Sequence, residues 1–223
     1  MAAFMIDFHT HTFASDGVLV PSELIRRAVV AGYQAIGITD HADESNLEDL
    51  INRAIRAAEA WAGETGIIVI PGVEITHVPP GRIHLVAKRA RELGARIVLV
   101  HGETVTEPVA PGTNAAGVRC PDVDILAHPG LISSEDAAAA AENGVFLEIT
   151  SRKGHSVANG RVARMAAQNS ADLVVSTDAH GPGDLISREF ARVLLAAAGI
   201  GEDGIERVFK NAENLLKRII GDQ

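Results

Sequence analysis

Seven short apolar runs, spread along the whole chain, most constrain the fold. They cover residues 4–8, 35–39, 67–71, 96–100, 124–127, 145–149 and 172–176. Strands that alternate with helices along a chain pair in parallel through right-handed crossovers. Aromatic residues make up only 4% of the chain, so Val, Ile, Leu and Ala must fill the core, which is typical of parallel strands buried on both faces. The sequence therefore predicts an α/β protein with a parallel sheet.

Helix-like segments fill the intervals between these runs. They cover residues 21–32, 46–64, 82–93, 133–144, 157–169, 184–198 and 203–220. Pro21 lies in the first turn of one helix, and Gly94 and Gly144 follow two others, as helix boundaries require. Seven strands in 223 residues predict one domain, residues 1–223, built as a closed or nearly closed barrel with one strand fewer than usual. An open doubly wound sheet is the alternative.

Charge and cysteine content limit the classes of function. The formal net charge of −9 argues against non-specific binding to nucleic acid or to an anionic membrane. It permits a phosphorylated substrate, because bound divalent cations reverse the local field. Cys120 is the only cysteine, so an intrachain disulfide is impossible, as is typical of a reducing cytoplasm. We expect no signal peptide and no membrane-spanning segment. The oligomeric state is left open.

Potential metal ligands gather where the predicted strands end. Six of the nine histidines and three acids lie at, or a few residues beyond, the ends of the apolar runs: His9, His11, Asp16, His41, Glu74, His101, His128, Asp178 and His180. Parallel barrels place their reactive groups at the carboxyl ends of the strands. Groups at six strand ends converge only if the strands surround a common point, which favours the barrel over the open sheet.

The spacing of these residues suggests how they would share cations. His9 and His11 lie two residues apart in extended chain, so both imidazoles face the same side. Asp178 can join them, because the first and last strands of a closed barrel are neighbours. The two oxygens of Glu74 can bridge to a second cation between His101 and His128. Asp16, His41 and His180 remain for a third cation.

The motifs in this order resemble those of the PHP (polymerase and histidinol phosphatase) metallophosphoesterases over essentially the whole chain. The matching segments are Asp7-Phe8-His9-Thr10-His11, Thr39-Asp40-His41, Pro71-Gly72-Val73-Glu74, Val100-His101-Gly102, Ala127-His128-Pro129 and Ser176-Thr177-Asp178-Ala179-His180. The resemblance implies a distorted (βα)7 barrel with a trinuclear site. It assigns His9, His11, Glu74 and Asp178 to the first cation. It assigns Glu74, His101 and His128 to the second, and Asp16, His41 and His180 to the third. Many family members carry histidine where Asp16 stands, and aspartate is also a competent hard ligand.

Phosphoester hydrolysis is the reaction that such a site predicts. Two or three divalent ions, with Zn, Mn or Fe suited to nitrogen and oxygen ligands, would generate hydroxide near neutral pH and neutralise the phosphoryl oxygens. Arg152 follows the sixth strand and can hold phosphate through its planar fork. His77 and His155 are candidates for protonating the leaving group. Glu148 is a candidate for orienting a ligand.

The leading hypothesis is a phosphatase that acts on a small phosphorylated substrate, with L-histidinol phosphate the candidate that the resemblance suggests. The Pro- and Gly-rich residues 104–121 are expected to cover the site as a lid. Cleavage of nucleotide or oligonucleotide phosphodiesters is a second hypothesis, because the family includes exonuclease domains. A non-catalytic, metal-stabilised binding module is a third.

Overall fold

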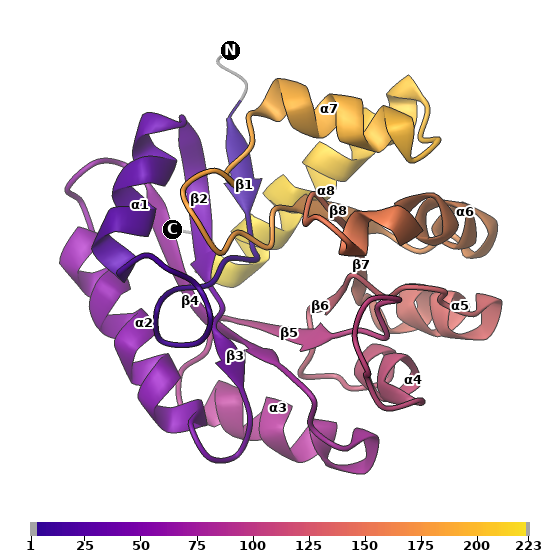
Figure 1. Ribbon diagram of the computed structural model, residues 1–223, viewed down its shortest axis with the longest axis horizontal. Coiled ribbons are helices and arrows are strands. Elements are labelled where there is room, and N and C mark those ends of the chain that lie inside the picture. Colours follow the sequence, from indigo (N-terminus) through magenta and orange to yellow (C-terminus); the bar gives the residue numbers. More distant parts are fainter. Residues whose placement is uncertain (1–3, 222–223) are drawn as a thin grey trace.

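Seven parallel strands form a nearly closed barrel within a ring of helices in the computed structural model, which describes residues 4–221 (Figure 1). In order around the barrel, the strands are β1 (Met5–Asp7), β2 (Tyr33–Ile38), β4 (Ile68–Ile75), β5 (Ile97–His101), β6 (Ile125–Ala127), β7 (Phe146–Thr150) and β8 (Leu173–Ser176). A further strand of two residues, β3 (His41–Ala42), pairs with the end of β4. The predicted distorted (βα)7 barrel is confirmed, and β3 is too short to leave a periodic signal in the sequence.

The helices follow the strands in the predicted alternation. They are α1 (Pro21–Val30), α2 (Leu47–Trp61), α3 (Ile83–Glu92), α4 (Thr113–Val118), α5 (Ser134–Asn143), α6 (Asn159–Asn169), α7 (Arg188–Ala197) and α8 (Glu202–Ile220). Two short 3₁₀ turns cover Pro80–Arg82 and His155–Ala158. Helix α4 lies inside the segment predicted as a lid, where a six-residue helix containing Gly117 gives little periodicity. None of the helices between residues 4 and 221 combines the length and apolar composition that a bilayer crossing requires.

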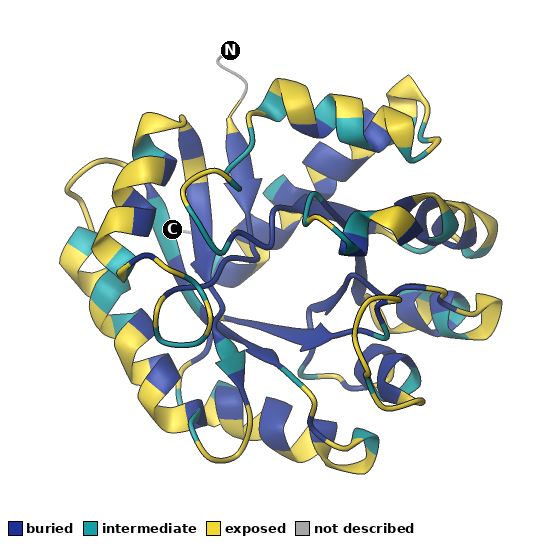
Figure 2. Ribbon diagram, viewed as in Figure 1, coloured by how far each residue is buried: buried dark blue, intermediate teal, exposed yellow. Residues whose placement is uncertain are grey.

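Two apolar cores hold the barrel together. One lies between the strands and the surrounding helices, whose outer faces are exposed (Figure 2). The other fills the barrel interior with side chains such as Phe8, Ile70 and Leu99. Leu215 and Leu216 of α8 pack against this inner core and close the barrel at the amino ends of the strands. The carboxyl ends are therefore the end left open to a polar site.

The seam between the first and last strands is joined by a few specific contacts instead of a ladder. The His11 amide donates to the Ala179 carbonyl at 2.8 Å. The Asp7 carboxylate accepts from the amide of Thr177 at 3.1 Å and from its hydroxyl at 2.5 Å. Burial raises the pKa of Asp7 to about 6, although the hydrogen bonds from Thr177 oppose this. These contacts bring residues 9–11 beside residues 177–180.

Candidate metal centre

All nine predicted ligands lie at the carboxyl-terminal end of the barrel. Three of the residues at this end have a positive φ that is unusual for a side chain-bearing residue: His77 at 55°, His128 at 27° and Asp178 at 54°. Backbone strain of this kind gathers at functional sites, where the surrounding structure holds it in place. The three residues follow the ends of β4, β6 and β8.

Glu74 occupies the middle of the inner cluster. Its Oε2 lies 3.3 Å from His9 Nε2, and its Oε1 lies 3.4 Å from His128 Nε2. Asp178 Oδ1 lies 3.2 Å from His11 Nε2. Three sets of three donor atoms each fit within 4.8 Å of one another: His9, Glu74 and His128; His9, His11 and Asp178; and His128, His155 and Asp178. A carboxylate in this position faces ligands on both of its oxygens.

An outer cluster forms around Asp16. Its Oδ2 lies 3.0 Å from His180 Nε2, and its Oδ1 lies 3.5 Å from His41 Nε2. With His11, these residues offer four donor atoms within 4.8 Å of one another. The Asp16 side chain is 54% exposed, so this cluster borders solvent. The aspartate that departs from the common family pattern thus lies beside both histidines with which it was grouped.

Several buried polar atoms in the inner cluster have no hydrogen-bond partner among residues 4–221. They are Nε2 of His9, both ring nitrogens of His11, both carboxylate oxygens of Glu74, and Nδ1 of His101 and of His128; Ser176 Oγ is one more. Each buried polar atom without a partner costs about 1–3 kcal/mol. Nitrogen and oxygen atoms that face one another in this way are a donor set suited to divalent cations. The residues therefore fit bound metal ions.

Burial and neighbouring charges shift the pKa values of the cluster residues in different directions. Burial favours the neutral imidazole, but Glu148 and Glu74 outweigh it and raise the pKa of His9 well above its usual range. Burial lowers the pKa of His41 too, but the Glu74 and Asp16 carboxylates outweigh it and raise this pKa to about 10. The surrounding histidines, His9 first among them, hold the pKa of Glu74 well below its usual range against its burial. At His11, in contrast, burial and the neighbouring His41 lower the pKa to about 4, so this ring is neutral at pH 7.

Residues behind the clusters fix the orientation of the rings. Glu148 Oε1 lies 2.8 Å from His9 Nδ1, and its Oε2 accepts from the His128 amide at 2.9 Å. The Thr76 hydroxyl lies 2.6 Å from His41 Nδ1. A hydrogen bond to one ring nitrogen directs the other towards a metal. Glu148 thus occupies the orienting position predicted for it, whereas Thr76 gave no signal in the sequence.

The structure separates the three predicted catalytic residues. The His155 ring stacks on His128 with centroids 4.3 Å apart, and its Nε2 lies 3.9 Å from Asp178 Oδ2. Arg152 lies at the rim, with Nη1 at 3.6 Å from Asp184 Oδ2. His77 is half-exposed, and its side chain is 3.9 Å from a carboxylate oxygen of Glu107. His155 is therefore inside the site, while Arg152 and His77 are at its edge.

His101 and Glu107 form a pair that the sequence interpretation missed. His101 Nε2 lies 3.0 Å from Glu107 Oε2, and His101 belongs to none of the close donor groups within residues 4–221. The predicted grouping of Glu74, His101 and His128 is thus only partly brought together. Glu107 gave no signal because it lies in the loop between β5 and α4, away from any strand end.

The sequence is similar to known proteins and to one protein family. The PHP domain family matches residues 7–116. An uncharacterized protein of Methanocaldococcus jannaschii is 50% identical over 218 residues, 96% of this chain and 99% of the relative. A probable phosphatase of Thermoanaerobacter sp. is 28% identical over 89% of this chain and 88% of its own. Ribonuclease P protein component 3 of Methanosarcina mazei is 27% identical over 88% of this chain and 82% of its own.

Solved structures share the fold at low sequence identity. The structure of archaeal ribonuclease P with mature tRNA contains a chain with a TM-score of 0.70 and 18% identity, over 95% of this chain and 90% of that one. Histidinol phosphate phosphatase of Lactococcus lactis, complexed with zinc, L-histidinol and phosphate, has a TM-score of 0.62 and 14% identity. The match covers 87% of this chain and 93% of that one. With its motifs, its barrel and these relatives, the chain belongs to the PHP domain family.

Proposed function

We propose that this protein is a metal-dependent phosphatase that hydrolyses a small phosphomonoester, with L-histidinol phosphate as the favoured substrate. The observation that carries the proposal is the group of buried nitrogen and oxygen atoms around Glu74 that face one another without hydrogen-bond partners within residues 4–221. The relative named a probable phosphatase supports the class of reaction.

The family resemblance assigns three ligand sets to these residues, of which His101 alone joins no close donor group within residues 4–221. His9, His11, Glu74 and Asp178 would hold one ion; Glu74, His101 and His128 a second; Asp16, His41 and His180 a third. Bound divalent cations of the Zn, Mn or Fe type would supply nucleophile activation and neutralise phosphoryl charge.

The remaining residues of the site position and bind the ester. Glu148 fixes the His9 ring through the 2.8 Å contact to Nδ1. Arg152 is assigned to the phosphoryl oxygens, because its guanidinium is at the rim and can bind two oxygens at once. The Thr104 hydroxyl lies 2.6 Å from His155 Nδ1. With that hydroxyl as donor, the single proton of the neutral ring is on Nε2, because burial and the neighbouring His128 lower the pKa of His155 to about 4. Nε2 faces the cluster and can donate a hydrogen bond to the leaving-group oxygen.

The loop over the site favours a compact substrate. Thr104 and Thr106 both contact His155 Nδ1, at 2.6 and 3.0 Å. Glu107 reaches His101 from the same segment. A loop that lies on the ligand histidines leaves room for a phosphorylated small molecule more readily than for a polymer.

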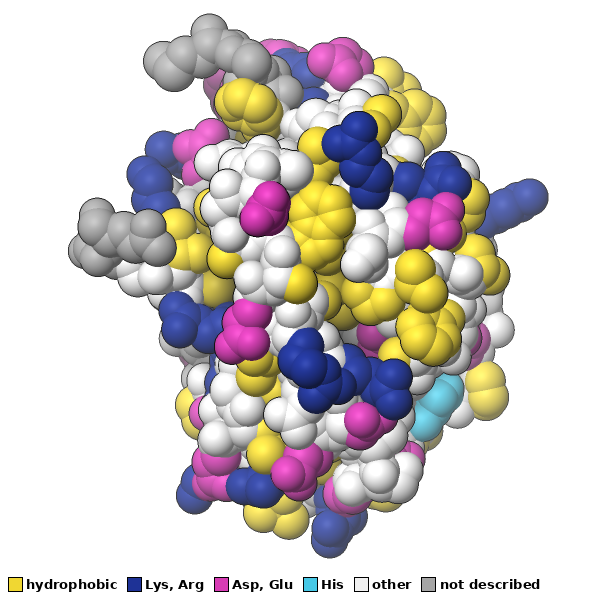
Figure 3. Space-filling model, turned by 90° about the vertical axis from the view of Figure 1, so that its left-hand side faces the viewer, with side chains coloured by type: hydrophobic (Ala, Val, Ile, Leu, Met, Phe, Trp, Pro, Cys, Tyr) yellow, Lys and Arg dark blue, Asp and Glu magenta, His cyan; other side chains and the backbone are white. Residues whose placement is uncertain are grey.

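Hydrolysis of a nucleotide or RNA phosphodiester is the second candidate. The likeness to ribonuclease P protein component 3, and to a chain in a ribonuclease P structure with tRNA, weighs against the expectation, drawn from the net charge, that nucleic acid is not a partner. On the face in Figure 3, by contrast, Lys and Arg side chains are interspersed with Asp and Glu and form no continuous basic stripe. Few phosphate contacts are therefore expected on this one face.

A substrate screen with site variants tests the proposal. Protein reconstituted with Zn, Mn or Fe would be assayed for phosphate release from histidinol phosphate and nucleoside monophosphates, and for cleavage of a short RNA. We expect monoester turnover that is lost in His9→Ala and Glu74→Ala, with circular dichroism showing a retained fold. Equal turnover in those variants would rule out the assigned site. Turnover of RNA alone would replace the monoesterase with the second candidate.

A further inference from the structure

We propose that Glu107 is an additional carboxylate ligand of the metal centre, supplied to the ion at His101 by the loop between β5 and α4. The inference rests on the proposed function, because it assumes that metal ions occupy the site. It goes further by coupling the loop that covers the site to metal binding.

The contacts of Glu107 are with histidine nitrogens. Its Oε2 lies 3.0 Å from His101 Nε2 and 3.9 Å from His77 Nε2, and its Oε1 lies 3.4 Å from His155 Nε2. One carboxylate thus reaches the rings of three histidines from three different segments of the chain.

The separation matches that of two ligands on one ion. Donor atoms that each lie about 2.1 Å from the same cation, at angles between octahedral and tetrahedral, are roughly 3.0–3.4 Å apart. Two inner-cluster pairs have this spacing, with 3.3 Å for His9–Glu74 and 3.2 Å for His11–Asp178, whereas His11–Glu74 at 3.6 Å and His9–Asp178 at 3.7 Å are wider. The 3.0 Å between Glu107 and His101 falls in the same range. His101, which joins no other close donor group within residues 4–221, acquires an oxygen partner in this way.

Contacts at the base of the loop hold Glu107 beside His101. At its base, the Glu103 carboxylate accepts from the amides of Gly112 at 3.0 Å and Asn114 at 2.9 Å. Gly130 has a φ of 58°, and a side chain there would collide with the Glu103 carbonyl, so the base packs tightly on the next loop. The two glutamates of one loop therefore have different partners: Glu103 binds backbone amides, and Glu107 contacts ring nitrogens.

Cobalt binding by matched variants tests the proposal. Full-length wild type, Glu107→Gln and Glu103→Gln would be titrated with Co²⁺ after chelation, with the affinity of each site and the visible absorption of bound cobalt recorded. Glutamine keeps the acceptor oxygen that Glu103 needs, so Glu103→Gln is the isosteric control from the same loop. Circular dichroism and thermal unfolding would establish that each variant folds.

We expect Glu107→Gln to weaken one cobalt site by at least ~10-fold and to change its absorption band, while Glu103→Gln resembles the wild type. Hydrogen exchange of residues 104–112 should slow on cobalt binding in the wild type and not in Glu107→Gln. Wild-type affinity in Glu107→Gln would overturn the proposal. Weaker affinity with an unaltered band would also overturn it, because that result makes Glu107 a positioning residue for His101.

Failure of this inference is distinguishable from failure of the proposed function. If Glu74→Ala abolishes cobalt binding and Glu107→Gln does not alter it, only the role of Glu107 is wrong. If Glu74→Ala also binds cobalt as the wild type does, the metal centre itself is misplaced.

Discussion

The two ends of the barrel differ in what they bury: apolar side chains at the amino end and polar, charged side chains at the carboxyl end. At the amino end, α8 lies across the starts of the strands, and Leu216 and Ile219 complete an apolar core. At the carboxyl end, Glu74 is fully buried, and both of its oxygens are without hydrogen-bond partners in the described chain. One end gains stability from burial, while the other gives up stability to hold charged groups together. The fold separates the two tasks along one axis.

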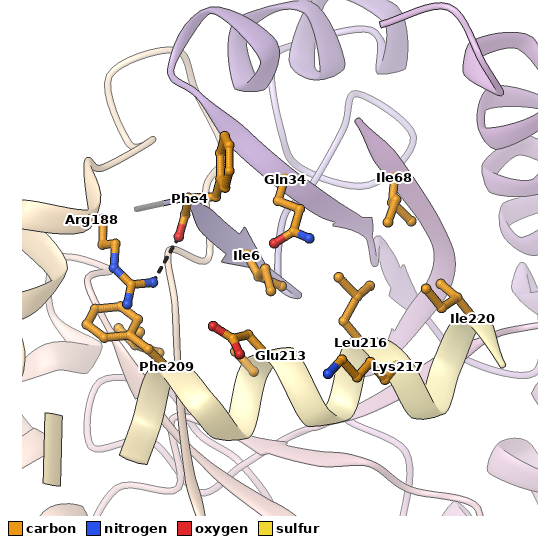
Figure 4. A pocket seen from close by; sticks show the side chains of 12 residues that line it. Phe4, Ile6, Gln34, Ile68, Arg188, Phe209, Glu213, Leu216, Lys217 and Ile220 are labelled. Carbon is orange, nitrogen blue, oxygen red and sulfur yellow. Dashed lines mark hydrogen bonds between the residues drawn. The ribbon is translucent and has the colours of Figure 1, made fainter. Parts of the chain in front are cut away.

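The amino end also contains a cavity, which the carboxyl-end chemistry does not use. It has a volume of about 670 Å³ and lies between α8 and the strand starts (Figure 4). Ile6, Ile68 and Leu216 contribute apolar walls. At one side, Arg188 donates to the Phe4 carbonyl at 2.9 Å and lies 3.7 Å over the Phe209 ring. The Arg188 guanidinium is therefore partnered, in contrast to the polar atoms around Glu74.

The largest expected effect is on activity at the carboxyl end. Glu74→Ala should lower kcat/KM for the best monoester by more than ~100-fold, because loss of a ligand exceeds the 10- to 100-fold typical of an outer hydrogen-bond partner. Steady-state kinetics at saturating metal would measure it. Glu142→Ala, on the exposed surface of α5, is the control that should retain wild-type kinetics. If kcat/KM of Glu74→Ala stayed within about threefold of the wild-type value, catalysis would not depend on the carboxyl end as assigned.

At the amino end, Leu216→Ala should lower the free energy of unfolding by about 2–5 kcal/mol, because it removes a buried side chain from the inner core. Urea unfolding would measure the loss. The kcat of the folded fraction should stay at the wild-type value. Val193→Ala, at a position 61% exposed, should change stability by no more than ~0.5 kcal/mol. Loss of kcat in folded Leu216→Ala would show that the two ends are coupled.

Metal binding should stabilise the protein through the carboxyl end. A ligand at 100 times its dissociation constant adds about 2.7 kcal/mol to the free energy of unfolding. Chelated protein should therefore melt at a lower temperature than protein with excess Mn²⁺ in differential scanning calorimetry. Leu216→Ala should show the same gain as the wild type, and Glu74→Ala a much smaller one. An equal gain in all three would place the ions elsewhere.

The smallest expected effect is a release of protons when metal binds at neutral pH. In chelated protein, the carboxylates around His41 raise its pKa to about 10, so this ring is protonated at pH 7. A metal that binds the ring must displace that proton, and affinity should rise as the pH increases towards 10. Calorimetric titration in buffers of different ionisation enthalpy would count the protons. A count of zero at pH 7 would contradict the assignment.

The sequence was most informative where chemistry coincides with periodic structure. His9, Glu74 and His128 were identifiable because each follows an apolar run, and parallel strands place those ends together. The barrel was predictable for the same reason, since the alternation of strands and helices allows few topologies.

Prediction failed where the contact depends on loop conformation. Glu107 follows His101 by six residues in a Pro- and Gly-rich segment, and no periodicity indicates which way it points. Its place depends on Glu103 binding the Gly112 amide and on the fit of Gly130, neither of which leaves a pattern. His77 follows Glu74 by three residues and lies half-exposed at the rim, so its role in protonating the leaving group stays a prediction.

Anomalous diffraction from crystals of the Mn²⁺-loaded protein tests the central claim most directly, because it locates bound ions without reference to activity. The account predicts at least two manganese peaks at the carboxyl end of the barrel, one of them in contact with Glu74 and a ring nitrogen of His9 or His128. Peaks confined to the outer surface, with none among these side chains at saturating manganese, would contradict it.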